Sequence, residues 1–107
     1  MHFLNGYQTF NRVEIVKAFK YQRYLHYNSI FFVYIILESD EPLYVGSTSN
    51  VFWRMQKHQN KISSRTSIYI KSFERKVDAL REERHFIRLL KPKYNKRHCN
   101  RYQLELL

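Results

Sequence analysis

The chain has 107 residues and a formal net charge of +10 at pH 7, which fits one small domain with a polyanionic partner. Its 44% hydrophobic and 17% aromatic residues can build a core, whereas two Gly and two Pro exclude a flexible linker. A single cysteine excludes an internal disulfide framework and argues against a thiolate zinc site. Nucleic acid is the first candidate partner and an anionic membrane surface the second, with a merely soluble basic domain as the alternative.

Targeting signals are not visible in the sequence. The N-terminus has no charged segment followed by an apolar run, so we do not expect a secretory signal. The longest apolar run, Ile30 to Leu37, is too short to span a bilayer. We therefore expect an intracellular, cytoplasmic protein without a membrane partner, in the host cytoplasm if a phage encodes it.

Residues 1–29 form a basic, aromatic extension in which rings alternate irregularly with Lys and Arg. A helix between Arg12 and Tyr24 is predicted, although the apolar positions do not gather into one stripe. Such interleaving suits stacking on bases and contacts with phosphates. The plainer interpretation is that these rings cover an open side of the core. A third interpretation is that residues 1–29 bind a partner protein.

A β-hairpin is predicted next. Ile30 to Leu37 is apolar at both alternating sets of positions, which predicts a strand covered on both faces. A turn over Glu38 to Pro42 leads to a returning strand, Leu43 to Gly46. A hairpin folded about residue 39 places Tyr34 and Tyr44 opposite one another, either as two site hydroxyls or as a simple aromatic pair. Gly46 ends the strand where the chain bends tightly or a ligand approaches the backbone.

A basic helix from about Asn50 to Asn60 follows a run of polar N-cap candidates. Arg54 and His58 are four residues apart and so share a face of this helix, with Lys57 adding charge. The free N–H groups at the helix N-terminus would also favour an anion. The alternative is a solvated basic face on an ordinary amphipathic helix.

A third strand, Ser67 to Phe73, and a second helix, Lys76 to Leu90, complete the pattern, with Pro92 ending the helix. On the helical wheel Glu83 falls within roughly 20° of the centre of the apolar stripe. A carboxylate facing the core costs on the order of several kcal/mol unless a cation pairs with it. A bound metal and a buried ion pair with Arg54 both satisfy this requirement, and the sequence leaves both open.

These residues match the motifs of one nuclease family in order and at the expected spacing. The first motif is Phe32-Val33-Tyr34 and the second is Tyr44-Val45-Gly46, followed by Ser47. The stretch from about 30 to 96 therefore resembles a GIY-YIG nuclease domain, with Phe32 and Val33 in place of the Gly and Ile of the first motif. The six matching site positions are Tyr34, Tyr44, Arg54, His58, Glu83 and Asn95.

The resemblance implies an α+β fold, with a small three-stranded antiparallel sheet flanked by helices over residues 30–107. It also implies a divalent-metal-dependent endonuclease that hydrolyses phosphodiester bonds in DNA, with a single Mg²⁺ or Mn²⁺ held by Glu83. The alternative is a catalytically inactive nucleic-acid-binding or inhibitory module on the same fold. No appended DNA-reading module is recognised.

The resemblance further implies a role for each site residue. Tyr34 would take a proton from the attacking water, with its pKa lowered by the metal and by Arg54. Tyr44 and His58 would orient that water or share the proton. Arg54 would bind the scissile phosphate, and Asn95 would position the carboxylate or the phosphate. The expected substrate-binding residues are Gly46, Ser47, Lys57 and Arg84.

Overall fold

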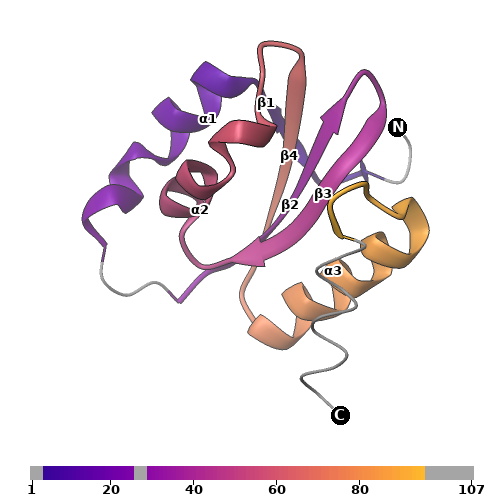
Figure 1. The fold of residues 1–107 in the computed structure, drawn as a ribbon. Coiled ribbons are helices and arrows are strands. Elements are labelled where there is room, and N and C mark those ends of the chain that lie inside the picture. Colours follow the sequence, from indigo (N-terminus) through magenta and orange to yellow (C-terminus); the bar gives the residue numbers. More distant parts are fainter. Residues whose placement is uncertain (1–3, 26–28, 96–107) are drawn as a thin grey trace.

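The structure is a computed structural model that describes residues 4–25 and 29–95. Figure 1 shows the arrangement of its elements. They are, in chain order, β1 (Gln8–Phe10), α1 (Arg12–Phe19), the 3₁₀-helix η2 (Lys20–Tyr24), β2 (Phe31–Glu38), β3 (Glu41–Thr48), α2 (Val51–Lys57), the 3₁₀-helix η3 (Gln59–Lys61), β4 (Thr66–Phe73) and α3 (Lys76–Leu90).

One antiparallel sheet separates two helical layers. Its strand order is β1-β4-β2-β3, with α1, η2 and α2 on one face and α3 on the other (Figure 1). The α+β class is confirmed, but the expected number of three strands is wrong because the sheet has four. The additional strand, β1, is only three residues long, and so short a segment carries no readable alternation.

Strand β2 lies at the centre of the core, and its expected coverage on both faces is confirmed. Tyr34 and Ile36 belong to the cluster beneath the layer of α1 and α2. Val33 and Ile35 belong to the opposite cluster, which packs against α3. The continuous apolar run follows from this position between two layers, because each side of the strand must meet other side chains.

The hairpin between β2 and β3 has a different register from the one expected. Ser39 (φ 49°) and Asp40 (φ 66°) form a two-residue turn, so that Glu38 pairs with Glu41. A bulge then shifts the register between Ile36 and Leu37, and Tyr34 pairs with Gly46 rather than with Tyr44. Without the extra residue, Tyr34 would face a position whose side chain points to the other layer. The bulge therefore returns the site tyrosines to one face.

Residues of the N-terminal segment belong to the folded core. The helix predicted between Arg12 and Tyr24 is confirmed as α1 followed by η2. It starts at a capping box, in which Asn11 and Glu14 exchange side-chain and backbone hydrogen bonds. Ile15 and Phe19 pack in the α2-side cluster and Leu4 packs in the α3-side cluster. The interpretation in which this segment covers the core is confirmed for these residues.

Helix α3 has the predicted bounds and ends at Lys91, whose left-handed backbone (φ 47°) precedes Pro92. The chain then runs along the outer edge of β3, where Lys93 N–H donates to the Pro42 carbonyl and Tyr94 N–H to that of Leu43. This contact covers an edge that would otherwise expose unpaired backbone groups. Within the described residues, no helix has the length and apolar character needed to cross a membrane.

The contribution of α1 to the core can be measured with two substitutions in that helix. Ile15 is 2% exposed and Val13 is 60% exposed. We expect Ile15→Ala to lower the free energy of unfolding by about 2–5 kcal/mol, because it leaves a cavity under the sheet. Val13→Ala should change it by less than about 0.5 kcal/mol. Equal denaturant midpoints for the two variants would contradict this placement of α1.

Candidate active site

Gly46 lies directly beneath the phenol of Tyr34. A Cβ at Gly46 would overlap the Tyr34 Oη and Cζ atoms and would stand 2.9 Å from Tyr44 Cε1. The close approach expected at this glycine is therefore real, but the approaching group is the Tyr34 ring. Any larger residue would push that ring away, because β2 and β3 are hydrogen-bonded neighbours and cannot separate.

The Tyr34 hydroxyl lies at the centre of a polar cluster. The side chain is fully buried, and Oη lies 2.9 Å from His58 Nε2. Burial raises the pKa of Tyr34 above its ordinary value, with the charge of Tyr44 adding to the rise and Arg54 opposing it through its charge and hydrogen bonding. Arg54 by itself does not produce the lowered pKa expected above. The negative charge of Glu83 adds a smaller contribution to the rise in the pKa of Tyr34.

His58 is buried against both tyrosines. Its ring lies 4.5 Å from the Tyr44 ring and 5.5 Å from the Tyr34 ring, centroid to centroid, and the two tyrosine rings stack at 5.9 Å. Burial lowers the pKa of His58 to about 4, assisted by the positive charges of Lys61, Arg54 and Lys57. The imidazole is therefore neutral near pH 7. Its Nδ1 atom is buried and has no hydrogen-bond partner among residues 4–25 and 29–95.

Helix α2 is shorter than predicted and ends at Lys57, so His58 is its C-cap residue rather than a residue within it. The chain continues there into the 3₁₀-helix η3. The side chains of Arg54 and His58 nevertheless reach the same cluster around Tyr34. At the N-terminus of α2, two of the N–H groups that were expected to be free have partners within the fold. Asn50 Oδ1 accepts the N–H of Trp53, and the Gln22 side chain accepts that of Val51.

Glu83 reaches the site from the α3 side of the sheet. It is half-buried, and its Oε1 accepts a hydrogen bond of 2.8 Å from the Ser47 hydroxyl. Ser47, expected to bind substrate, thus contacts the carboxylate that the sequence singled out. The neighbouring Glu82 turns toward the N-terminal segment, where it accepts from Tyr7 Oη at 3.0 Å and lies 4.0 Å from Lys71 Nζ. The two adjacent carboxylates therefore have different roles.

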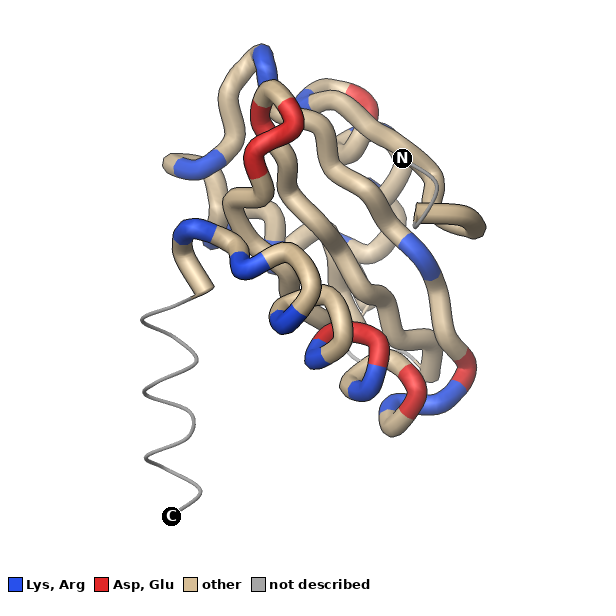
Figure 2. The backbone as a smooth tube through the Cα atoms, turned by 90° about the vertical axis from the view of Figure 1, so that its right-hand side faces the viewer, with Lys and Arg blue, Asp and Glu red and all other residues tan. Residues whose placement is uncertain are grey.

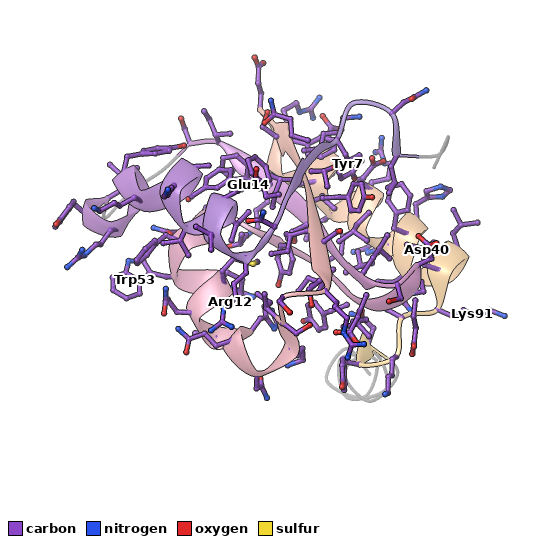
Figure 3. All side chains as sticks on the ribbon, turned by 90° about the horizontal axis from the view of Figure 1, so that it is seen from above. Tyr7, Arg12, Glu14, Asp40, Trp53 and Lys91 are labelled. Atoms are coloured by element: carbon purple, nitrogen blue, oxygen red, sulfur yellow. The ribbon has the colours of Figure 1, made fainter. Side chains whose placement is uncertain are left out.

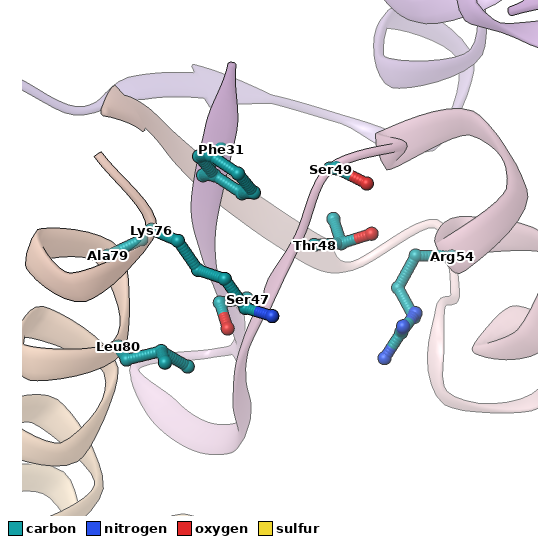
Figure 4. Close-up of a pocket in the computed structure, with 8 residues that line it drawn as sticks. All are labelled: Phe31, Ser47, Thr48, Ser49, Arg54, Lys76, Ala79 and Leu80. Atoms are coloured by element: carbon teal, nitrogen blue, oxygen red, sulfur yellow. The ribbon is translucent and has the colours of Figure 1, made fainter. Parts of the chain in front are cut away.

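A pocket of about 200 Å³ opens beside Ser47, between the start of α3 and helix α2. Arg54 reaches in from α2 and Lys76 from α3, with Ser47 on the strand between them (Figure 4). Acidic side chains are absent from the pocket's lining residues, and Phe31 forms part of the wall. A pair of cations around a pocket without acidic lining residues suits an anion such as phosphate. Sequence reasoning missed Lys76 because its helical position predicted only a solvated end.

Asn95 is 1% exposed, and both polar atoms of its side chain contact the backbone of Val45. Oδ1 accepts from Val45 N–H at 2.7 Å, and Nδ2 donates to the Val45 carbonyl at 2.9 Å. The amide imitates a neighbouring strand on the edge of β3. It therefore fixes the strand that carries Tyr44 and Gly46, which differs from the expected contact with carboxylate or phosphate.

Two expected substrate contacts, Lys57 and Arg84, are exposed and lie outside the pocket lining. Basic and acidic positions alternate along α3 (Figure 2), and Arg84 is one of the exposed basic residues of this helix. Lys61, which we did not predict as a site residue, lies 5.9 Å from the Tyr44 ring centre and 5.5 Å from that of Tyr94. In the sequence, Lys61 is one charged residue in a polar loop, and nothing there indicated a position near the site.

The donor set limits how a metal could be held. Across residues 4–25 and 29–95, no group of three or more His, Cys, Asp or Glu side chains is arranged to bind a metal ion. A divalent cation here would take one carboxylate, that of Glu83, and complete its shell with water and phosphate oxygens. Mg²⁺ commonly binds in this manner, so the residues present fit such an ion.

The contact between Gly46 and Tyr34 predicts a strong coupling in stability. Gly46→Ala should lower the free energy of unfolding by about 1–3 kcal/mol, because the added methyl group overlaps the phenol. The loss should be much smaller in a Tyr34→Ala background, as a double-mutant cycle in denaturant can measure. The matching cycle with Leu37→Ala, on the opposite face, should be additive. Additivity in the Tyr34 cycle would rule out the close approach.

Burial of neutral His58 predicts a pH-dependent stability. The folded pKa of about 4 lies below the ordinary 6.5, so the unfolded chain binds this proton first as pH falls. The contribution of neutral His58 to the free energy of unfolding is fully present above about pH 6.5. It is lost as the pH falls from 6.5 to 4, and the free energy of unfolding then decreases by at most about 1.4 kcal/mol per pH unit. Denaturant unfolding of the parent and of His58→Gln should show a shallower slope in the variant. Identical slopes would contradict the burial.

The stretch that carries the candidate site matches a known protein family. A family model of the GIY-YIG catalytic domain matches residues 30–95, which carry both tyrosines, the arginine, the histidine, the glutamate and the asparagine of the site. No curated protein and no solved structure matches the chain. The matched stretch covers more than half of the sequence, and on this ground the chain belongs to the GIY-YIG nuclease family.

Proposed function

We propose that this protein is a divalent-metal-dependent endonuclease that hydrolyses phosphodiester bonds in DNA. The observation that carries the proposal is the buried Tyr34 hydroxyl, bonded to His58 and influenced by both Arg54 and Glu83 beside a pocket with two cations. The net charge of +10 supports a polyanionic substrate.

The phosphate is bound by the cations of the pocket. Arg54 offers a planar fork that suits two phosphate oxygens, and it stabilises the charge that develops during attack. Lys76, on the opposite wall, supplies a second positive charge for the same or the adjoining phosphate. Both side chains approach from helices that the sheet holds apart, so the distance between them is set by the fold.

Glu83 would hold the divalent cation. When bound, Mg²⁺ or Mn²⁺ neutralises charge on the scissile phosphate and stabilises the leaving oxygen. The hydrogen bond from the Ser47 hydroxyl holds the Glu83 carboxylate next to a residue that also lines the pocket. Ser47 therefore acts by positioning Glu83, and it also stands within reach of a bound phosphate.

Tyr34 and His58 accept the proton that the attacking water loses. As the water oxygen attacks phosphorus, its proton passes to Tyr34 Oη, and the phenolic proton passes to His58 Nε2, which lies 2.9 Å away. Because its pKa is lowered to about 4, the His58 imidazole is neutral at pH 7, and in its Nδ1–H tautomer it presents Nε2 as the acceptor. The P–O bond to the leaving oxygen breaks in the same displacement. This route uses no ionised phenol before substrate binds.

A single substitution tests the enzyme against the inactive nucleic-acid-binding module. We expect Glu83→Gln to remove nicking of supercoiled plasmid in Mg²⁺ or Mn²⁺, because a neutral amide is a poor ligand for a hard cation. DNA affinity and the unfolding midpoint should change little. Chelator added to the parent should have the same effect as the substitution.

The control variant is Glu41→Gln, which removes a carboxylate at the exposed hairpin turn, and it should cleave like the parent. Cleavage retained by pure Glu83→Gln would overturn the proposed mechanism. A parent protein that binds DNA yet leaves plasmid intact with either metal would instead favour the inactive module.

A further inference from the structure

Gln22 is a buried amide in a segment that is otherwise exposed. It lies in η2 and is 0% exposed, whereas Lys20, Tyr21, Arg23 and Tyr24 around it face solvent. A buried amide is costly unless its polar atoms are bonded. The partners of Gln22 therefore show what this segment is built to hold.

Those partners lie at the start of α2. Gln22 Oε1 accepts from the Val51 N–H at 2.7 Å, and the Gln22 carbonyl accepts from Asn50 Nδ2 at 2.9 Å. Its Nε2 donates to Tyr21 Oη at 3.2 Å, which fixes the amide orientation. Asn50 in turn caps α2 by accepting from Trp53 N–H at 3.0 Å. Gln22 thus accepts from the first N–H of the helix. It also holds Asn50, which accepts from the third N–H.

Helix α2 needs such support because it is short. Seven residues are too few for an independently stable helix, so tertiary contacts must define its position. Arg54 lies in its middle, and His58 follows its last residue. At that far end, the bond between His58 and Tyr34 fixes the chain to the sheet. Gln22 is the corresponding attachment at the near end.

We propose that Gln22 is a positioning residue of the nuclease site, and that η2 fixes the helix that presents Arg54 to the phosphate. The inference rests on the proposed function. It assigns a role to a residue outside the family match, which begins at residue 30. Because Gln22 touches neither pocket nor phosphate, its loss should affect the rate of the chemical step more than the binding of DNA. A misplacement of about 1 Å at a reacting group can cost on the order of 100-fold in rate.

The principal experiment compares Gln22→Leu, which fills the space but lacks the amide, with Gln22→Glu, which keeps an oxygen for the Val51 N–H. We expect Gln22→Leu to lower kcat by at least about tenfold with KM nearly unchanged, and Gln22→Glu to retain most of the rate. The control is Leu4→Ala, which removes a side chain from the cluster on the opposite face of the sheet. It should lower the unfolding midpoint while leaving kcat near the parent value at a temperature where all variants are folded.

A second readout does not depend on activity. Trp53 is the single tryptophan of the chain; it projects from α2 and is 50% exposed (Figure 3). Its emission should therefore shift in Gln22→Leu and stay unchanged in Leu4→Ala. Should Gln22→Leu not fold, Asn50→Ser keeps a capping oxygen but lacks the donor to the Gln22 carbonyl, and it should shift the emission in the same direction.

Two outcomes would overturn the inference. One is an unchanged kcat and an unchanged Trp53 emission in the folded Gln22→Leu protein. The other is an equal loss of kcat in Leu4→Ala at matched stability, which would mean that general destabilisation explains the effect. If the parent lacks nuclease activity, the proposed function fails, whereas the emission of Trp53 still decides whether Gln22 positions α2.

Discussion

The placement of the Tyr34 phenol across Gly46 is the contact on which the site depends. Because Gly46 has no side chain, the ring of Tyr34 passes over β3 and its hydroxyl meets His58 in a buried setting. Glu83 comes from α3 on the other face of the sheet, where the Ser47 hydroxyl of β3 donates to its carboxylate. Strand β3 thus separates the two layers and, through the adjacent Gly46 and Ser47, contacts site residues on both faces.

Much of this fold follows from the sequence. The apolar run of β2, the alternation of β4 and the amphipathic α3 are strong local signals, and each element occurs near its predicted place. The bulge in the hairpin is different, because one residue of register depends on turn geometry that composition does not specify. Strand β1 is also invisible locally, since its three residues are ordered only by pairing with β4.

The spatial partners of the candidate site residues could not be predicted from the sequence. Spacing and residue type pointed to Tyr34, His58 and Glu83. They could not show that the Asn95 amide hydrogen-bonds to the Val45 backbone or that Lys76 lines the pocket. Such facts depend on which elements become neighbours in space. The sequence does not indicate that Gln22 is buried, because glutamine is usually found at the surface.

The N-terminal edge strand has a consequence for any shortened form of the protein. A chain cut to the family match would lose β1 and expose the backbone edge of β4, which pairs with it over Gln8 to Phe10. Removing α1 would also uncover apolar surface beneath the sheet. Open edges beside bare hydrophobic faces are templates for intermolecular pairing and domain swapping. The folded unit of this protein is therefore larger than the family match, and transferring it to another protein would require the N-terminal segment as well.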